Sequence, residues 1–212
     1  GDHTHDEQPG AYQAVREILG TWHSCLWQVP GNHDDRSVLR AVFRDRVSGD
    51  GADPIRFAFE ANGWLCLGLD THLPGEVSGE MTVDQIRWLT TELADSAATR
   101  VALFLHHPPV EIGSTWMDSI GLRGRERLQE VAAADDRIRF ICCGHVHHEF
   151  QTSVAAADVV TSPSTGIQFN PAGTRPNFAA DAPGYRVIEL LPEQFTTRVV
   201  RLPEIKYRPE QG

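Results

Sequence analysis

Apolar side chains recur every three or four residues in several stretches of this chain, which is the spacing of a helix with one buried face. These stretches cover residues 9–19, 37–47, the segment after Thr82, and 122–134. Pro9 stands at a position typical of helix starts, and Gly20 closes the first stretch. Thr82 and Gln85 form a capping-box pattern before the third. We therefore predict four helices.

Continuous apolar runs between these helices predict buried strands. They cover residues 24–29, 64–69, 101–105 and 138–143. Asn62-Gly63 is the strongest short hairpin signal, so residues 55–60 and 64–69 should form an antiparallel pair that ends at Asp70. Helical spacing disappears after residue 149, and further strands are predicted over 159–161, 185–191 and 195–202.

Strands that alternate with helices, followed by a β-rich segment, predict an α/β fold in which two packed sheets carry helices on the outside. With 212 residues, of which 41% are hydrophobic, the chain can bury a sizeable core as one domain. We expect this domain to cover residues 1–203. Residues 204–212, which contain charges and Pro209, are expected to be a surface tail.

Composition and charge limit the classes of partner that we expect this chain to bind. The formal net charge of −10 argues against a nucleic-acid surface, for which a basic stripe is typical. No apolar run approaches the roughly 20 residues that a membrane span needs, so no membrane partner is expected. The four cysteines (Cys25, Cys66, Cys142 and Cys143) lie in or beside apolar runs, which predicts buried thiols, no disulfide framework and a cytoplasmic location.

Side chains that could bind metal ions or take part in catalysis occur where apolar runs end. Oxygen and imidazole donors occur at Asp2, Gly31-Asn32-His33-Asp34, His106-His107-Pro108 and Gly144-His145-Val146-His147. Donors on loops at one edge of a sheet can converge. Fe, Mn and Zn take such mixed oxygen and imidazole ligands, whereas Mg and Ca favour sites richer in oxygen. Each short motif alone is weak evidence, because a single histidine at a strand end is more often a satisfied polar group than a ligand.

Together and in this order, the motifs resemble those of the calcineurin-like metallophosphoesterases. Within that superfamily the chain is most similar to the bacterial class III cyclic-AMP phosphodiesterases of the Icc/CpdA type. The closer similarity rests on Val29-Pro30-Gly31-Asn32-His33-Asp34, Leu69-Asp70-Thr71, Leu105-His106-His107-Pro108-Pro109, Cys143-Gly144-His145-Val146-His147, Pro163-Ser164-Thr165, Gln168-Phe169, Asn177-Phe178 and Pro183-Gly184-Tyr185-Arg186.

The resemblance implies a four-layer α/β/β/α sandwich of two mixed sheets flanked by helices. It also implies two divalent or mixed-valence metal ions (Fe, Mn or Zn), with Asp2 bridging them. Asn32, His106 and His145 would complete the second metal site, and His147 would serve the first. A hydroxide held between the ions would attack phosphorus, and His33 would stabilise the transition state or protonate the leaving oxygen. Cyclic AMP would give 5′-AMP.

One family motif has no counterpart here. The family carries an Asp-x-His pair on a first β-α unit, and we expect that unit to lie ahead of Gly1 in a longer parent. The first metal site then keeps only Asp2 and His147, so this chain would bind at most one ion firmly and hydrolyse diesters very poorly. A less favoured alternative is that His3 or His5 replaces the lost ligands. His107 and His148 are expected beside the ligands or on the surface.

Several alternatives remain open from the residues. Gly31-Asn32-His33-Asp34-Asp35 also occurs in glycerophosphodiester enzymes of this kind, so a glycerophosphodiester or broad-specificity phosphodiesterase is the main rival. A non-catalytic binding scaffold with the same fold is a rival from another class. The β-rich segment and the exposed tail suggest a homodimer. Asp70 is expected either as an acceptor behind the metal ligands or as a local cap.

Overall fold

The computed structural model describes residues 1–47 and 49–206. The helices are α1 (Pro9–Leu19), the 3-10 helix η1 (Gly20–Cys25), α2 (Arg36–Val42), α3 (Val83–Asp95), α4 (Thr115–Asp118) and α5 (Arg125–Ala134). The strands are β1 (Phe57–Ala61), β2 (Trp64–Leu69), β3 (Gly79–Glu80), β4 (Arg100–Leu105), β5 (Leu122–Arg123), β6 (Ile138–Cys143), β7 (Gln151–Val154), β8 (Ala157–Thr161), β9 (Gly184–Leu190) and β10 (Phe195–Arg201). No helix in this described part is long and apolar enough to cross a membrane.

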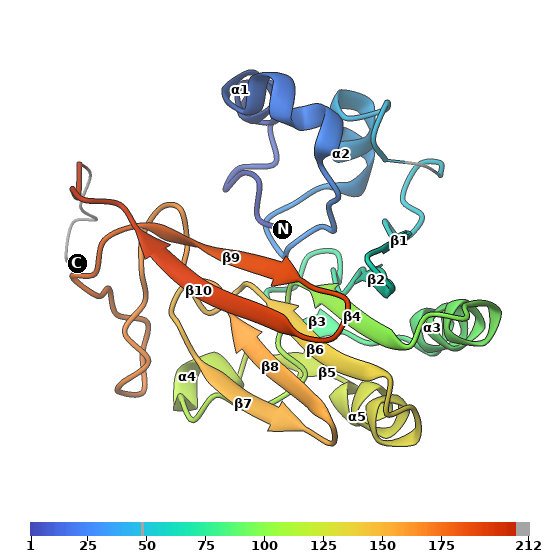
Figure 1. The fold of residues 1–212 in the computed structure, drawn as a ribbon. Helices are drawn as coiled ribbons and strands as arrows, with labels where there is room; N and C mark the ends of the chain where they lie inside the picture. Colours follow the sequence, from blue (N-terminus) through green and yellow to red (C-terminus); the bar gives the residue numbers. More distant parts are fainter. Residues whose placement is uncertain (48, 207–212) are drawn as a thin grey trace.

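Six strands form the central sheet in the order β1-β2-β4-β6-β8-β7 (Figure 1). The four inner strands are parallel, whereas β1 and β7 pair antiparallel at the two edges. Strands β9 and β10 form a separate antiparallel ribbon, and β3 pairs with β5. Because the inner strands point the same way, their carboxyl ends share one edge, which is where open α/β sheets bind ligands.

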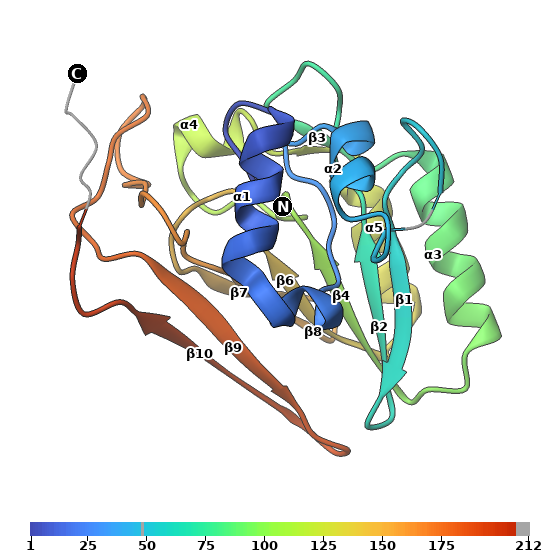
Figure 2. The same cartoon turned by 90° about the horizontal axis from the view of Figure 1, so that it is seen from above.

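Both faces of the central sheet are covered, with α3 and α5 on one side and the β9–β10 ribbon on the other (Figures 1 and 2). Along β2, Leu65, Leu67 and Leu69 belong to the core shared with α3 and α5, whereas Trp64 and Cys66 belong to the core under the ribbon. Successive side chains of a strand point to opposite faces, so a strand covered on both faces reads as a continuous apolar run. The expected α/β class, with a mixed central sheet flanked by helices, is confirmed. The sheet that packs on its other face is the two-stranded antiparallel β9–β10 ribbon.

Two local signals in the sequence are confirmed. Asn62 and Gly63 have φ values of 52° and 80°, and positive φ at both positions is what a type I′ hairpin turn requires. This turn joins β1 to β2. Thr82 caps α3 by accepting a hydrogen bond from the backbone N–H of Gln85 at 3.2 Å. The turn and the cap each depend on residues only a few positions apart, which explains why the sequence alone predicts them.

Helices α1 and α2 pack against each other through their own apolar cluster. Tyr12 of α1, Leu39 of α2 and Phe43 are fully buried there, and Ile55 closes the cluster from the segment before β1. Residues 26–35 connect η1 to α2. The motif Gly31-Asn32-His33-Asp34 lies in this connection, so the packing of α1 against α2 holds it in position.

The strand predicted over residues 24–29 is wrong. Its first two residues belong to η1, and residues 26–30 pair with no strand in the described part of the chain. Pro30 has no N–H to offer a neighbouring strand. The apolar run instead reflects burial, since Val29 is 6% exposed, and the buried amide of Gln28 has no hydrogen-bond partner among the described residues.

The helix predicted over residues 37–47 ends early, at Val42. Phe43 leaves helical geometry with a φ of −107°, and the chain turns there through a hydrogen bond from the N–H of Arg46 to the carbonyl of Phe43. Phe43 and Val47 nevertheless stay buried in the cluster of α1 and α2. The helical spacing of apolar residues therefore continues past the end of the helix itself.

The helix predicted over residues 122–134 starts late, at Arg125. Gly124 has a φ of 70°, which stops helical geometry on its amino-terminal side, and the two residues before it pair with β3 instead. Strand β7 was not predicted. Its side chains alternate between exposed and half-buried at a sheet edge and include no long apolar run.

Cysteine burial is confirmed for three of the four thiols. Cys66 and Cys143 are buried, Cys142 is half-buried, and none of the four forms a disulfide. Burial raises the pKa of Cys66 and of Cys142 to about 11, so neither thiol ionises readily near neutral pH. The prediction for Cys25 is wrong, because this residue ends η1 and is exposed.

Asp70, at the carboxyl end of β2, ties the sheet to α2. Its carboxylate accepts hydrogen bonds from the Arg36 guanidinium at 2.7 and 2.9 Å. It also accepts the backbone N–H groups of Ile55, at 2.7 Å, and His72, at 2.9 Å. The Asp70 side chain is fully buried and that of Arg36 is 12% exposed. The contact with Ile55 also explains why β1 begins at Phe57 rather than at residue 55.

We predict that Asp70→Asn lowers the free energy of unfolding by about 3 kcal/mol, because it leaves a nearly buried guanidinium without its counter-charge. The matched control is Asp84→Asn, which breaks the Arg56–Asp84 ion pair where Asp84 is 60% exposed and should cost less than about 1 kcal/mol. Urea unfolding of both variants measures the difference. Equal losses in the two variants would contradict the structural role given to Asp70.

Candidate metal centre

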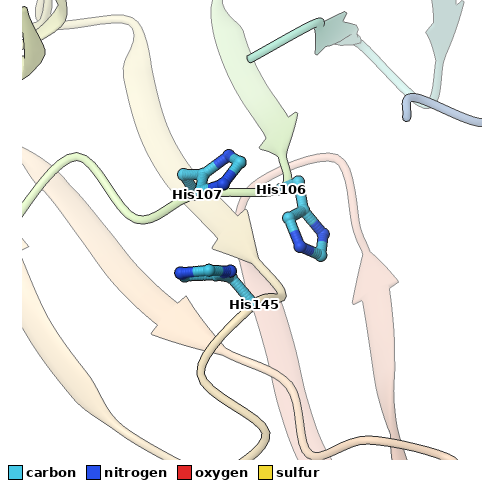
Figure 3. Close-up of side chains that lie close together, drawn as sticks. All are labelled: His106, His107 and His145. Carbon is cyan, nitrogen blue, oxygen red and sulfur yellow. The ribbon is translucent and has the colours of Figure 1, made fainter. Parts of the chain in front are cut away.

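Polar residues from four segments meet at the carboxyl edge of the central sheet. His106 and His107 directly follow β4, and His145 follows β6 (Figure 3). Asn32 comes from the connection before α2, and Asp2 from the first residues of the chain. The parallel pairing of β4 with β6 places the three histidines side by side.

Four of these side chains present their donor atoms to one another. Asn32 Oδ1 lies 3.2 Å from His106 Nε2 and 3.0 Å from His145 Nδ1. Asp2 Oδ2 lies 3.1 Å from His106 Nε2. Neighbouring ligands of one ion with bonds near 2.1 Å are separated by about 3.0–3.4 Å, so these spacings suit a shared cation. The two oxygens and two imidazole nitrogens suit Fe, Mn or Zn.

Two carboxylates fix the loops that carry these donors. Asp2 Oδ1 accepts the backbone N–H of His33 at 2.9 Å. In return, Asp34 accepts the backbone N–H groups of Asp2 at 2.7 Å, His3 at 3.0 Å and Gly31 at 2.8 Å. A Cβ atom on Gly31 would overlap the Asp2 carboxylate, so this close approach requires glycine. Each loop therefore holds the backbone of the other.

A tyrosine of helix α1 stabilises the same arrangement of loops. The Tyr12 hydroxyl donates a hydrogen bond to Asp34 at 3.0 Å and accepts one from the N–H of Asp35 at 2.8 Å. Tyr12 and Asp34 are both fully buried. Sequence reasoning used Tyr12 only as an apolar helix position, because a tyrosine at helical spacing does not reveal what its hydroxyl contacts.

His107 lies within the histidine cluster but has other partners. Its ring nitrogens lie 2.8 Å from the Thr71 hydroxyl and 3.1 Å from the Val77 carbonyl. Possible ligand atoms of His106, His107 and His145 all lie within 4.8 Å of one another. Both nitrogens of His107 are already engaged, and its ring packs beside those of His106 and His145. This fits the expectation of a place next to the ligands.

His147 reaches the same edge, but no hydrogen bond joins it to the four donors in the described part of the chain. Its Nδ1 lies 2.9 Å from the Ile167 carbonyl, and its ring stacks on Phe169 with centroids 4.4 Å apart. His148 turns away, with its Nδ1 2.7 Å from the Val146 carbonyl. The structure thus brings Asp2, Asn32, His106 and His145 together and leaves His147 beside them.

The remaining histidines near Asp2 have separate environments. The half-buried His33 ring lies beside His5, with centroids 4.6 Å apart, and no described residue forms a hydrogen bond with it. His3 Nδ1 lies 3.1 Å from the Asp34 carboxylate. This contact uses only Nδ1, so the replacement of the lost ligands by His3 stays a prediction.

The electrostatics of the site suit a bound cation. Burial and the neighbouring His106 lower the pKa of His145 to about 3. Burial, with His145 and His106 nearby, also holds the pKa of His107 well below its usual value. Burial alone would raise the pKa of Asp2, but the His106 imidazole and the His33 N–H lower it overall. A neutral His145 and an ionised Asp2 are the protonation states that coordinate metal ions.

Proteins with similar sequences are phosphodiesterases. The chain is 33% identical over 214 residues to 3′,5′-cyclic adenosine monophosphate phosphodiesterase CpdA of Escherichia coli (strain K12), covering 99% of this chain and 75% of that protein. It is 29% identical over 201 residues to glycerophosphodiester phosphodiesterase GpdQ of Enterobacter lignolyticus, covering 93% and 72% of the two chains. No model of a known protein family matches the chain.

A dimetal phosphatase from Danio rerio has a similar structure, with a TM-score of 0.56 at 16% identity, covering 91% of this chain and 78% of that one. At this identity the structural similarity supports the fold alone. The sequence similarity to CpdA extends over 99% of this chain. The chain therefore belongs to the metallophosphoesterase superfamily, in the family of the bacterial CpdA phosphodiesterases, and is a hydrolase of phosphoesters.

Proposed function

We propose that this protein hydrolyses 3′,5′-cyclic AMP to 5′-AMP in a metal-dependent reaction. The observation that carries this proposal is the convergence of Asp2, Asn32, His106 and His145 at the carboxyl edge, at distances that suit one cation. The 33% identity to CpdA supports a cyclic nucleotide as the substrate.

The four converging residues would hold one metal ion, and Asp2 and His147 would contribute to a second. When bound, two divalent ions supply an activated water and neutralise charge on the phosphoryl oxygens. The chain's own part is to hold these donors in position, which the backbone hydrogen bonds between Asp2 and His33 and between Asp34 and Asp2 accomplish. Burial of His106 and His145, at 3% and 6% exposure, keeps bulk water away from the donors.

His33 is the residue that we propose to act on the substrate. Its backbone N–H is bound to Asp2, whereas its ring makes no hydrogen bond to any described residue. The ring nitrogens therefore stay available for a substrate. We propose that this nitrogen donates a proton to the departing 3′ oxygen, a task that suits an imidazole near neutral pH.

A glycerophosphodiester is the rival substrate, favoured by the string Gly31-Asn32-His33-Asp34-Asp35 and by the 29% identity to GpdQ. The decisive experiment compares turnover of cyclic AMP, cyclic GMP and glycerophosphoethanolamine by Mn²⁺-loaded protein. The proposal expects the highest kcat/KM on cyclic AMP, with 5′-AMP as product. A higher value on the glycerophosphodiester would favour the rival. No turnover of any diester by a longer chain that carries the upstream Asp-x-His pair would favour a binding scaffold.

His106→Ala tests the ligand set. We expect it to weaken Mn²⁺ or Zn²⁺ binding and to lower phosphodiesterase activity by more than the roughly 10- to 100-fold typical of residues that only support ligands. His23→Ala is the matched control, because His23 lies on η1 and bonds to the Gly20 carbonyl. Calorimetric metal titration and initial rates provide the readouts. Near-normal metal affinity in His106→Ala would rule out its place in the set.

His33→Ala separates proton donation from metal binding. We expect a loss of about 10²- to 10⁴-fold on cyclic AMP, whose alkoxide leaving group needs a proton. On bis-p-nitrophenyl phosphate the loss should be much smaller, because p-nitrophenolate leaves without one. Metal content should stay at the wild-type level. If both substrates lose the same factor, His33 acts instead on the charge of the phosphoryl oxygens.

A further inference from the structure

A loop after β8 supports His147, which forms no hydrogen bond with the four donors among the residues that the structure describes. Residues 163–169, here called the 163–169 loop, follow the segment that leaves β8. The loop meets His147 at three points. The backbone N–H of Phe169 lies 3.4 Å from the His147 carbonyl, the Ile167 carbonyl lies 2.9 Å from His147 Nδ1, and the Phe169 ring lies on the His147 ring.

The contact with Ile167 decides which nitrogen of His147 carries a proton. A backbone carbonyl can only accept a hydrogen bond, so Nδ1 must be the protonated nitrogen. In a neutral imidazole the free lone pair then lies on Nε2. The ring is therefore prepared to bind a cation through Nε2 before any cation arrives.

The contact with Phe169 decides the plane of the ring. The two rings are nearly parallel, with an interplanar angle of 13° and centroids 4.4 Å apart. Phe169 is itself fixed by Phe178, at 5.9 Å, and by the edge of Trp116, at 5.3 Å. A ring held by stacking on one side and by a hydrogen bond at Nδ1 has little freedom about its side-chain torsions.

The shape of the loop depends on Gln168, a polar residue that is only 2% exposed. Its amide nitrogen donates to the carbonyls of Ser164 at 2.7 Å and Gly166 at 3.1 Å. Its oxygen accepts from the N–H of Ser164 at 3.3 Å and from the Arg201 guanidinium at 3.0 Å. Every polar atom of the side chain is used within the loop or to join it to β10.

The backbone of the histidine motif also needs outside support. His145 and His147 have φ values of 67° and 50°, in the left-handed region that residues other than glycine rarely adopt. Such conformations persist where the surroundings enforce them. Val146, between the two, is buried in a cluster with Trp116 and Met117, against which Phe169 packs.

We propose that the 163–169 loop is a positioning device for His147. The Ile167 carbonyl selects the tautomer, the Phe169 ring sets the plane, and Gln168 keeps both in place, so that Nε2 of His147 faces a metal ion at the carboxyl edge. This inference rests on the proposed metal-dependent function. It adds three residues that neither touch the substrate nor bind the metal.

The first test reads the tautomer of His147 in metal-free protein by long-range ¹H–¹⁵N NMR. In the wild type we expect the neutral ring with the proton on Nδ1. In Phe169→Leu and Gln168→Ala we expect a mixture of both tautomers, and in Phe169→Tyr, which keeps the ring, the wild-type spectrum. A wild-type tautomer in both Phe169→Leu and Gln168→Ala would overturn the proposal.

The second test follows the same ¹⁵N signals during a Zn²⁺ titration. We expect His147 Nε2 to respond in the wild type, and the Zn²⁺ concentration at half-response to rise about 10- to 100-fold in Phe169→Leu. Phe195→Leu is the matched control, because Phe195 packs on Trp64 and Phe140 under the β9–β10 ribbon and not near His147. It should lose similar thermal stability without changing the Zn²⁺ response.

The outcomes separate the positioning role from the proposed function. An unchanged half-response in Phe169→Leu, an equal shift in Phe195→Leu, or binding of Zn²⁺ through Nδ1 would each overturn the positioning role. A longer chain that carries the upstream Asp-x-His pair, shows the expected His147 response and hydrolyses no phosphodiester would instead reject the proposed function and leave the positioning role intact.

Discussion

Parallel pairing of β2, β4, β6 and β8 is the constraint on which the rest of this structure depends. It makes the carboxyl ends of strands from distant parts of the sequence neighbours along one edge. His106 and His145 are 39 positions apart, yet both follow strands that pair residue by residue, with Leu105 opposite Cys143. The cores on both faces of the sheet stabilise this pairing, so the positions of the donors depend on the burial of apolar side chains.

Asp2 and Asn32 do not follow strands of the sheet. Reciprocal hydrogen bonds between their two loops hold these donors in position. Asp2 holds the N–H of His33, and Asp34 holds the N–H of Asp2, while Tyr12 links Asp34 to the core of α1 and α2. Burial lowers the pKa of His145 and keeps its imidazole neutral, and the neighbours of Asp2 lower the pKa of its carboxylate and keep it ionised. A protein with a net charge of −10 can attract a phosphate ester only where a local positive charge outweighs that field, and a cation in this site would provide it.

Much of this site could be predicted from the sequence because its residues occur in short strings at the ends of apolar runs. The Asn62-Gly63 turn and the Thr82 cap were predictable for the same reason, because each depends on interactions among residues that lie within four positions of one another. The convergence of His106 with His145 followed from strand ends that share one edge, whereas Asn32 comes from a connection that follows no strand.

What could not be predicted depends on contacts between distant segments. The apolar run over residues 24–29 looked like a strand, but strand formation requires a neighbour, which a run of residue types does not specify. Asp70 was expected near the ligands or as a cap, and only the structure shows its pairing with Arg36. The roles of Gln168 and Phe169 were equally invisible, because they arise from contacts with His147 and Arg201.

The most direct test of the central claim is an anomalous-difference map from crystals of this protein grown with Mn²⁺. The account predicts a peak bonded to Asp2, Asn32, His106 and His145, within about 2.0–2.3 Å of one donor atom from each. The absence of a peak at the carboxyl edge, or a peak whose ligands are other residues, would contradict it.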